Sequence, residues 1–357
     1  EIGTFCNCTS LTTITGLNSV TSIGNYAFYG CTSLESIKIP GSVTNIGEWA
    51  FNDCTKLKSI EIPNNVKDIE IGTFCNCTSL TTITGLNGVK AIKFSAFYGC
   101  ASLGKIEIPD SVESIEDQAF KGCTKLKEIK IPTRVTNLGK NVFNGCASLK
   151  SITIPASIKS IGKNIFNGCA GLTSVTICNG VKSIENDAFN GCASLTSIKI
   201  PKSVTSIGND AFNGCTSLKE IEIPGSVTCI NDGTFSGCAS LTSITVPKSV
   251  TSIGAKAFNG CASLTSITIP ESVTSIGAEA FNDCASLTSI TIPKSVKSIG
   301  TKAFSGCTGL KEIEIKGIES IGDNAFLNCG FLNSISISGK ITTIGNDMFR
   351  ELRLTSI

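Results

Sequence analysis

The chain has 357 residues, with 30 basic and 28 acidic side chains and a formal net charge of +2. The two signs are interleaved, so there is no basic stripe for a phosphate backbone and we expect no nucleic-acid partner. Histidine is absent, which removes His-based triads and the commonest zinc ligand, and no apolar run approaches the roughly 18 residues of a membrane span. We therefore expect no enzyme, no catalytic, cofactor or metal site, and no membrane insertion.

A repeat of 23 residues organises the sequence. Phenylalanine recurs at this spacing from Phe5 to Phe304, then one residue early at Phe326, and again at Phe349. All ten prolines share one phase of the repeat, and fifteen of the nineteen cysteines lie three residues after a repeat Phe. Such a period is typical of a solenoid, because each unit buries its apolar face only against neighbouring copies. We predict a single solenoid domain over residues 1–357 with both ends in mid-repeat.

The first coil starts at Glu1, without an initiator Met or a signal-peptide pattern. We therefore expect a mature or truncated piece of a longer chain. Residues 1–18 are identical to residues 70–87, which indicates duplication by whole repeats. Each copy carries an Asn-x-Thr sequon, at Asn7 and Asn76, and both asparagines occupy the turn phase of the repeat. The turn accounts for them without a glycan, so glycosylation stays open.

Aromatic residues outside the Phe column gather in the N-terminal part of the chain. Tyr26 and Trp49 share a phase on neighbouring coils, and Trp49 is the only tryptophan. Tyr29, Tyr98 and Phe94 lie nearby in the repeat. Because Tyr and Trp anchor many protein interfaces, Tyr26 and Trp49 are candidate partner-binding residues. The alternative is that they pack along the edge of the coils.

A second candidate lies on the predicted strand face, which is otherwise mostly Ser and Thr. Five charged residues interrupt it on two consecutive coils: Lys105, Glu107, Lys127, Glu128 and Lys130. They form a candidate partner-binding patch. The alternative is a set of mixed-sign pairs that only keeps the surface soluble.

Residues 241–263 illustrate the strand half of one repeat. Leu241, Ile244 and Val246 alternate with polar residues, a pattern that predicts a short strand with one buried face. Pro247 follows and should end the strand, because proline has no N–H to donate to a ladder.

The second half of the same repeat predicts a shorter strand and a turn. Val250 and Ile253 supply a second apolar pair on the other side of the coil. Ala257 and Phe258 then suggest a helical or 3₁₀ turn that inserts the ring into the core. Gly260 occupies a phase that is Gly, Asn or Asp in every repeat except the last, so we expect a left-handed residue there.

The cysteine column, from Cys8 to Cys329, is expected to be a ladder of buried, reduced thiols. Parallel side chains on coils about 4.8 Å apart leave the Cβ atoms farther apart than the roughly 3.5–4.5 Å that a disulfide needs. Four cysteines lie out of phase and are expected to see solvent: Cys6, Cys75, Cys178 and Cys229.

The last repeat is irregular. Arg350, Glu351 and Arg353 surround Met348 and Leu352, and the usual Cys is missing. We expect a partial cap and therefore a better protected C-terminal end. The first coil should instead contact missing upstream repeats or another subunit.

The pattern L-x-x-I-x-I-P-x-S-V-x-x-I-G-x-x-A-F-x-G-C resembles the BspA-like leucine-rich repeats over essentially the whole chain. It departs from the common leucine-rich repeat where Ser, as at Ser249 and Ser272, replaces the usual Asn or Cys. The expected fold is an α/β solenoid: a right-handed leucine-rich-repeat rod or arc of about 16 coils, with parallel strands and short 3₁₀ or helical turns.

The resemblance implies a non-enzymatic, surface-exposed binding or adhesion solenoid, located at the cell surface or extracellular. Its partner would be a protein or glycan of unknown identity, such as extracellular matrix. It carries over no catalytic or ligand residues. Two alternatives remain. One is a structural filament subunit that self-associates end to end, and the other is a cytosolic interaction scaffold, which numerous free thiols would suit.

Overall fold

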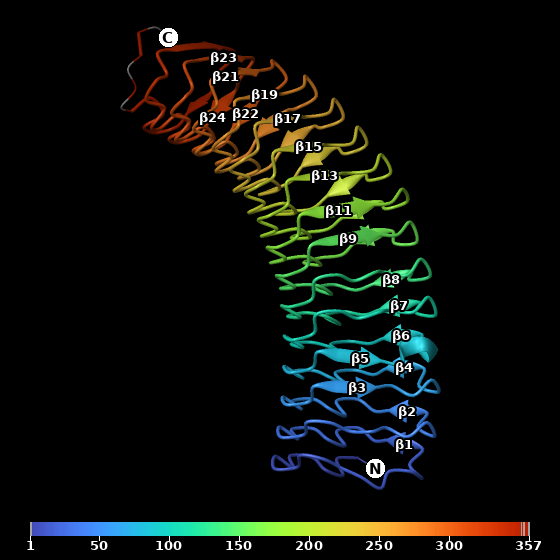
Figure 1. The fold of residues 1–357 in the computed structure, drawn as a ribbon. Helices are drawn as coiled ribbons and strands as arrows, with labels where there is room; N and C mark the ends of the chain where they lie inside the picture. Colours follow the sequence, from blue (N-terminus) through green and yellow to red (C-terminus); the bar gives the residue numbers. More distant parts are fainter. Residues whose placement is uncertain (1, 351, 353, 356–357) are drawn as a thin grey trace. The chain divides into compact units, whose positions relative to one another are not determined.

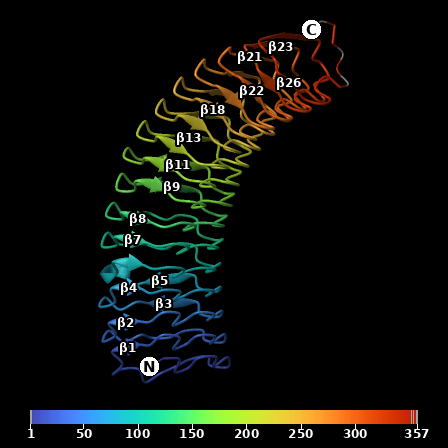
Figure 2. The same cartoon turned by 180° about the vertical axis from the view of Figure 1, so that it is seen from behind.

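The computed structural model describes residues 2–350, 352, 354 and 355. The chain divides into two compact units, Glu1–Cys178 and Asn179–Ile357. Within each unit, successive coils stack so that equivalent segments lie above one another (Figures 1 and 2). The chain forms a parallel-strand β-solenoid of about 14 turns with almost no helix. The predicted fold class is therefore confirmed.

In the first unit, each coil contributes up to two short strands, one to each of two parallel stacks. The first stack contains β3 (Ser59–Glu61), β5 (Thr82–Thr84), β9 (Ser151–Ile154) and β11 (Ser174–Ile177). The second contains strands of two residues: β1 (Ser22–Ile23), β2 (Asn45–Ile46), β4 (Asp68–Ile69), β6 (Ala91–Ile92), β7 (Ser114–Ile115), β8 (Asn137–Leu138) and β10 (Ser160–Ile161).

The second unit repeats this plan. Its first stack contains β13 (Ser197–Lys199), β15 (Glu220–Glu222), β17 (Ser243–Thr245), β19 (Ser266–Thr268), β21 (Ser289–Ile292), β23 (Glu312–Lys316) and β25 (Ser334–Ser338). Its second stack contains β12 (Ser183–Ile184), β14 (Ser206–Ile207), β16 (Cys229–Ile230), β18 (Ser252–Ile253), β20 (Ser275–Ile276), β22 (Ser298–Ile299), β24 (Ser320–Ile321) and β26 (Thr343–Ile344).

Strand pairing keeps the repeat in register. Ile244 of β17 pairs with Ile267 of β19, and Ile253 of β18 pairs with Ile276 of β20. The Ile side chains point inward and the flanking Ser and Thr side chains point outward. Each column of identical residues therefore runs along the stack, and the alternation read from residues 241–263 is confirmed.

The Phe column forms the centre of the core. In the first unit, neighbouring rings from Phe5 to Phe166 stack with centroids 5.1–5.9 Å apart and planes within 11° of parallel. The rings from Phe189 to Phe349 in the second unit are 5.2–6.4 Å apart. Offset-stacked aromatic pairs contribute about 0.5–1.5 kcal/mol each beyond the area that they bury.

The segment around each Phe is a run of turns. Within the described residues, the one helix is the 3₁₀ helix η1 (Leu86–Gly88), so the predicted turn at Ala257 and Phe258 exists but is not helical. The left-handed residue predicted at Gly260 is confirmed, with φ of 71°. A second left-handed residue, which the sequence did not predict, lies two positions before each Phe of the repeat column, as at Lys256 with φ of 56°.

Left-handed residues on both sides of the Phe align the backbone of this turn edge. In one coil the N–H groups of Lys256, Phe258 and Gly260 each donate to a carbonyl of the next coil, at 2.8 Å. The same three bonds recur along each unit and always point in the same direction. The turn edge is therefore held by backbone hydrogen bonds, which leaves its side chains free to vary from coil to coil.

The cysteine column is a hydrogen-bonded ladder. Cys261 donates its thiol to the carbonyl oxygen of Phe235, at 3.2 Å, and equivalent bonds of 3.1–3.3 Å recur in both units. The predicted burial is confirmed from Cys31 to Cys329, whereas Cys8 is exposed. Each thiol thus points at a backbone oxygen of the preceding coil.

Two predictions about the cysteines are wrong. Cys8 was expected to be buried with the rest of its column, but it is exposed, because the first coil has no coil before it to cover the thiol. Cys75 was expected to see solvent, but it is only 7% exposed. Burial, and then the charge of Asp53, raises the pKa of Cys75 to about 12. Cys6 is exposed, and Cys178 and Cys229 are half-buried, as expected. Of the residues in the predicted C-terminal cap, Glu351 and Arg353 lie outside the described residues, so that prediction stays untested.

Candidate binding surface

The charged strand patch is largely paired within itself. Lys105 Nζ lies 3.3 Å from Glu107 Oε1 and 3.5 Å from Glu128 Oε1, and Lys130 Nζ lies 4.0 Å from Asp110 Oδ1. Lys105, Glu128 and Ser151 are joined by isolated bridges instead of a continuous ladder. All of these charged side chains are well exposed, and exposed ion pairs of this kind contribute little to stability.

A hollow of about 650 Å³ lies over this patch and is lined by Lys105, Glu107, Glu128 and Lys130, but not by Lys127. A hollow of about 450 Å³ also lies over the Ser and Thr face of the second unit, between Ser266 and Lys316. Such hollows therefore accompany this strand face in both units. They do not single out the charged patch as a site.

The second candidate lies on the turn edge of the first unit. We call it the aromatic edge, defined by Tyr26, Tyr29, Trp49, Phe94 and Tyr98. Tyr26 is 39% exposed and Phe94 is 37% exposed, and the other three are half-buried. The ring of Tyr26 contacts that of Tyr29, with centroids 5.9 Å apart. The ring partner of Tyr26 is therefore Tyr29 and not Trp49.

Trp49 is held against the backbone of the next coil. Its ring covers Gly72, where a Cβ atom would collide with the indole. Trp49 and Gly72 share the left-handed phase, with φ of 57° and 60°. A bulky residue in this conformation costs roughly 1–2 kcal/mol, and the glycine beneath it provides the space in which the ring lies. The indole is therefore fixed in place, and the residue as a whole is half-buried.

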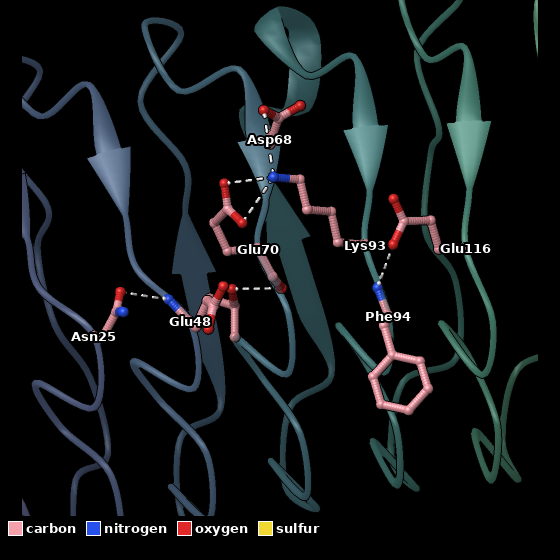
Figure 3. A network of polar contacts seen from close by, with 8 residues as sticks. Asn25, Glu48, Asp68, Glu70, Lys93, Phe94 and Glu116 are labelled. Carbon is pink, nitrogen blue, oxygen red and sulfur yellow. Dashed lines mark hydrogen bonds and ion pairs between the residues drawn. The ribbon is translucent and has the colours of Figure 1, made fainter.

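A polar network supports the aromatic edge (Figure 3). Lys93 Nζ contacts both carboxylate oxygens of Glu70, at 2.9 and 2.8 Å, and lies 3.9 Å from Asp68. The hydrogen bonds to Glu70 raise the pKa of Lys93. Glu116 accepts a hydrogen bond from the backbone N–H of Phe94 at 3.1 Å. The network thereby fixes the backbone that presents Phe94.

Sequence reasoning missed this network, although it left a signal. Glu70, Lys93 and Glu116 occupy the phase that is glycine in most repeats. At Gly47, in the same phase, a Cβ would lie 2.6 Å from the backbone nitrogen of Asn25. Charged residues of alternating sign on three consecutive coils, at a phase that is usually glycine, therefore indicate that this part of the turn edge differs from the rest of the repeat.

The rest of the turn edge carries no such side chains. In the coils after Gln118, the two phases that hold Trp49 and Phe94 contain only Lys, Asn, Asp, Glu, Thr, Ala and Gly. Ile71, half-buried between the coils of Trp49 and Phe94, adds to the apolar surface. Ile2 occupies the phase of Phe94 on the first coil and is exposed, so large apolar side chains at these phases are confined to the first five coils.

Other kinds of site are not evident in the described part of the chain. No three His, Cys, Asp or Glu residues there are grouped to hold a metal ion. Across the same residues, no helix has the length and apolar character of a membrane span.

The fold and its repeated columns define a leucine-rich-repeat solenoid. A family model described as the BspA type leucine rich repeat region matches residues 1–103, 90–202, 136–265, 182–310 and 251–357. The chain therefore belongs to the BspA-type leucine-rich repeat family. A search of curated proteins found no match.

Several solved structures are similar. A leucine-rich repeat protein from Bacteroides ovatus ATCC 8483 is 33% identical, with 93% of this chain and 80% of that chain covered and a TM-score of 0.74. A leucine rich cell surface protein from Faecalibacterium prausnitzii A2-165 is 29% identical, with 91% and 86% covered and a TM-score of 0.52. A leucine-rich repeat protein from Eubacterium ventriosum ATCC 27560 is 26% identical, with 82% and 89% covered and a TM-score of 0.58.

Proposed function

We propose that this chain is a non-enzymatic binding solenoid that acts at the cell surface and attaches to host matrix or to other cells. The observation that carries the proposal is the gathering of five partly exposed aromatic residues, those of the aromatic edge, on a few neighbouring coils; Phe331 in the second unit is also exposed but stands apart from them in the sequence. Clustered Tyr and Trp side chains are enriched where proteins bind partners. Membership of the BspA-type family and the similarity to a protein described as a cell surface protein support the location.

The aromatic edge is a better candidate than the strand patch. Its rings are partly exposed. Among the described residues, Tyr98 is the one ring of this edge with a cation over it, Lys121 Nζ at 5.7 Å from the centroid. In the strand patch, by contrast, Lys105 already forms ion pairs with Glu107 and Glu128. We therefore assign Tyr26 and Trp49 to the binding surface and treat Lys105, Glu107, Lys127, Glu128 and Lys130 as a solvated face.

The two alternative functions lack a specific supporting observation. Buried, hydrogen-bonded thiols suit an oxidising or a reducing compartment equally, so they do not favour a cytosolic scaffold. The filament and scaffold functions thus stay as untested predictions.

The test is attachment of the full chain to surfaces. Beads coated with the chain are applied to immobilised extracellular-matrix proteins and to fixed epithelial monolayers, with albumin-coated beads as the control. The proposal expects saturable retention that soluble chain competes away. Retention equal to that of albumin on every surface would contradict it.

A further inference from the structure

The chemistry around the aromatic edge says more about what it binds. The turn segments 24–31, 47–54, 70–77 and 93–100 hold three carboxylates, Glu48, Asp53 and Glu70, and a single ammonium, Lys93. The net charge of these segments is therefore −2, although the whole chain is close to neutral. An apolar surface with this local charge attracts cations and repels anions.

The carboxylates differ in how far they are already satisfied. Glu70 is neutralised by Lys93 at 2.8 Å. Asp53 accepts hydrogen bonds from the amides of Asn52 and Asn76, at 2.9 and 3.0 Å, which leaves its charge uncompensated. Among the described residues, the carboxylate of Glu48 has no ion-pair or hydrogen-bond partner. Glu48 directly precedes Trp49 in the chain, so the coil that presents the indole also carries an unpaired carboxylate.

The protein itself shows that this edge accepts an ammonium group. Lys121 places its Nζ over the ring of Tyr98, 5.7 Å from the centroid. Cations within about 6 Å of an aromatic face are attracted by the ring quadrupole, and tryptophan is the strongest partner. Trp49 and Phe94 offer comparable rings, and among the described residues no Lys or Arg side chain lies over either of them.

We propose that the aromatic edge binds a basic peptide segment, with a Lys or Arg side chain lying against Trp49 or Phe94 and its charge near Glu48. This inference rests on the proposed function, because it names the partner of the same surface. A neutral glycan could stack on the rings but would not need Glu48. An acidic partner would be repelled.

The single tryptophan supplies the readout. Fluorescence of Trp49 in the full chain is titrated with a 12-residue peptide of alternating Arg and Ser, with the same peptide carrying Glu in place of Arg, and with chitohexaose as a neutral glycan. We expect saturable change with the Arg peptide alone, and weaker binding as salt rises. Equal binding of the Arg and Glu peptides, or binding of chitohexaose alone, would overturn the proposal.

Variants locate the site without disturbing the coil. Glu48→Gln should weaken Arg-peptide binding at least fivefold. The control is Glu279→Gln, which removes a carboxylate from the turn edge of the second unit, at the phase of Trp49 and 3.7 Å from Lys256 Nζ; it should leave Arg-peptide binding unchanged. Trp49→Asn, measured by calorimetry, should weaken it about thirtyfold, as expected for an interface anchor. Asn occupies this left-handed phase at Asn141 and Asn164, so the variant keeps the turn.

The outcomes separate the two proposals. If Glu48→Gln binds the Arg peptide as tightly as the unchanged chain, the cationic partner is wrong even if the beads still attach. If beads with the unchanged chain attach, beads with the Trp49→Asn variant do not, and no peptide binds, the proposed function is supported and the proposal of a basic peptide partner is wrong. If neither beads nor peptides bind, both proposals fail.

Discussion

At the residue scale, each core cysteine fills a small volume and satisfies a backbone carbonyl. Cys261, for example, is buried and donates its thiol to Phe235 O at 3.2 Å. Because the neutral thiol is the form that the core accommodates, burial raises the pKa of Cys261 from 9.0 to about 12. Ionised sulfur would face the same carbonyl without a proton to donate.

This shift predicts an alkaline loss of stability. The stabilisation from such a thiol is fully present below pH 9, where it is protonated in both states, and is lost as the pH rises through about 12. Between these two pH values, each such thiol lowers the free energy of unfolding by about 1.4 kcal/mol per pH unit. Denaturant unfolding at pH 8 and pH 10.5 checks it. Lys and Tyr also titrate there, so Cys261→Ser is the control and should lose about 2 kcal/mol less than the unchanged chain. An identical loss in both chains would contradict this role.

Two glycines of one coil differ in what a methyl group would meet. At Gly260, with φ of 71°, a Cβ has only ordinary contacts at 3.7 Å and beyond. At Gly254 it would lie 2.6 Å from the backbone nitrogen of Asp232. We expect Gly260→Ala to cost about 1 kcal/mol from backbone strain alone, and Gly254→Ala to cost about 3 kcal/mol from the collision.

Thermal or denaturant unfolding of the two variants decides between these costs. Gly260→Asn serves as the control, because Asn adopts this conformation at Asn76 and Asn328, and it should cost less than Gly260→Ala. The reverse order of the two Ala variants would show that space, and not backbone conformation, limits the Gly260 phase.

At the scale of elements, proline limits how far a strand of the first stack can run, although β11 also ends at Ile177, where Cys178 follows. β9 and β21 end at Ile154 and Ile292, directly before a proline. In the coils where Lys316 and Ser338 replace it, β23 and β25 extend to five residues, and these two residues pair with each other. The sequence predicted this termination, because the missing N–H of proline is a property of the residue itself.

The Phe stack should make each coil depend on its neighbours. Phe258 stacks between Phe235 and Phe281, at 5.6 and 5.2 Å. We expect Phe258→Ala to destabilise by about 3–5 kcal/mol because it leaves a cavity in the core. Phe258→Leu, which fills most of that volume, should cost less. Hydrogen exchange on both variants should show the loss spreading to the adjoining coils. A loss confined to the coil of Phe258 would count against stacking.

The sequence predicted well which positions of the repeat are buried, but it predicted poorly which side chains of adjacent coils touch. Phase alone gave the inward Ile and Leu residues, the left-handed turn at Gly260 and the buried thiols. It did not reveal that Cys75 is covered or that Trp49 lies on Gly72, since both facts depend on which residue the next coil presents. The left-handed conformation at Lys256 was missed because neither Lys nor Trp signals positive φ, and the hydrogen bonds between coils enforce it.

At the scale of the molecule, repetition supplies the scaffold and local departures supply the function. The backbone bonds of the turn edge recur coil after coil, so large side chains can be placed there without changing the fold. Where the repeat is followed most closely, as around residues 241–263, the edge is polar. Where it departs, at Trp49, Glu70, Lys93 and Phe94, the aromatic edge appears.

The central claim is that the aromatic edge of the first unit, and not the strand face, carries attachment. Bead retention on the surface that the unchanged chain binds best is the measurement that tests it most directly. It compares the double variant Trp49→Asn with Phe94→Asn against the double variant Lys105→Ser with Glu107→Thr, which restores the Ser and Thr found at Ser243 and Thr245. We predict that the first loses most retention, by roughly thirtyfold in affinity, and that the second retains it. Loss by the strand-face variant with full retention by the edge variant would contradict the account.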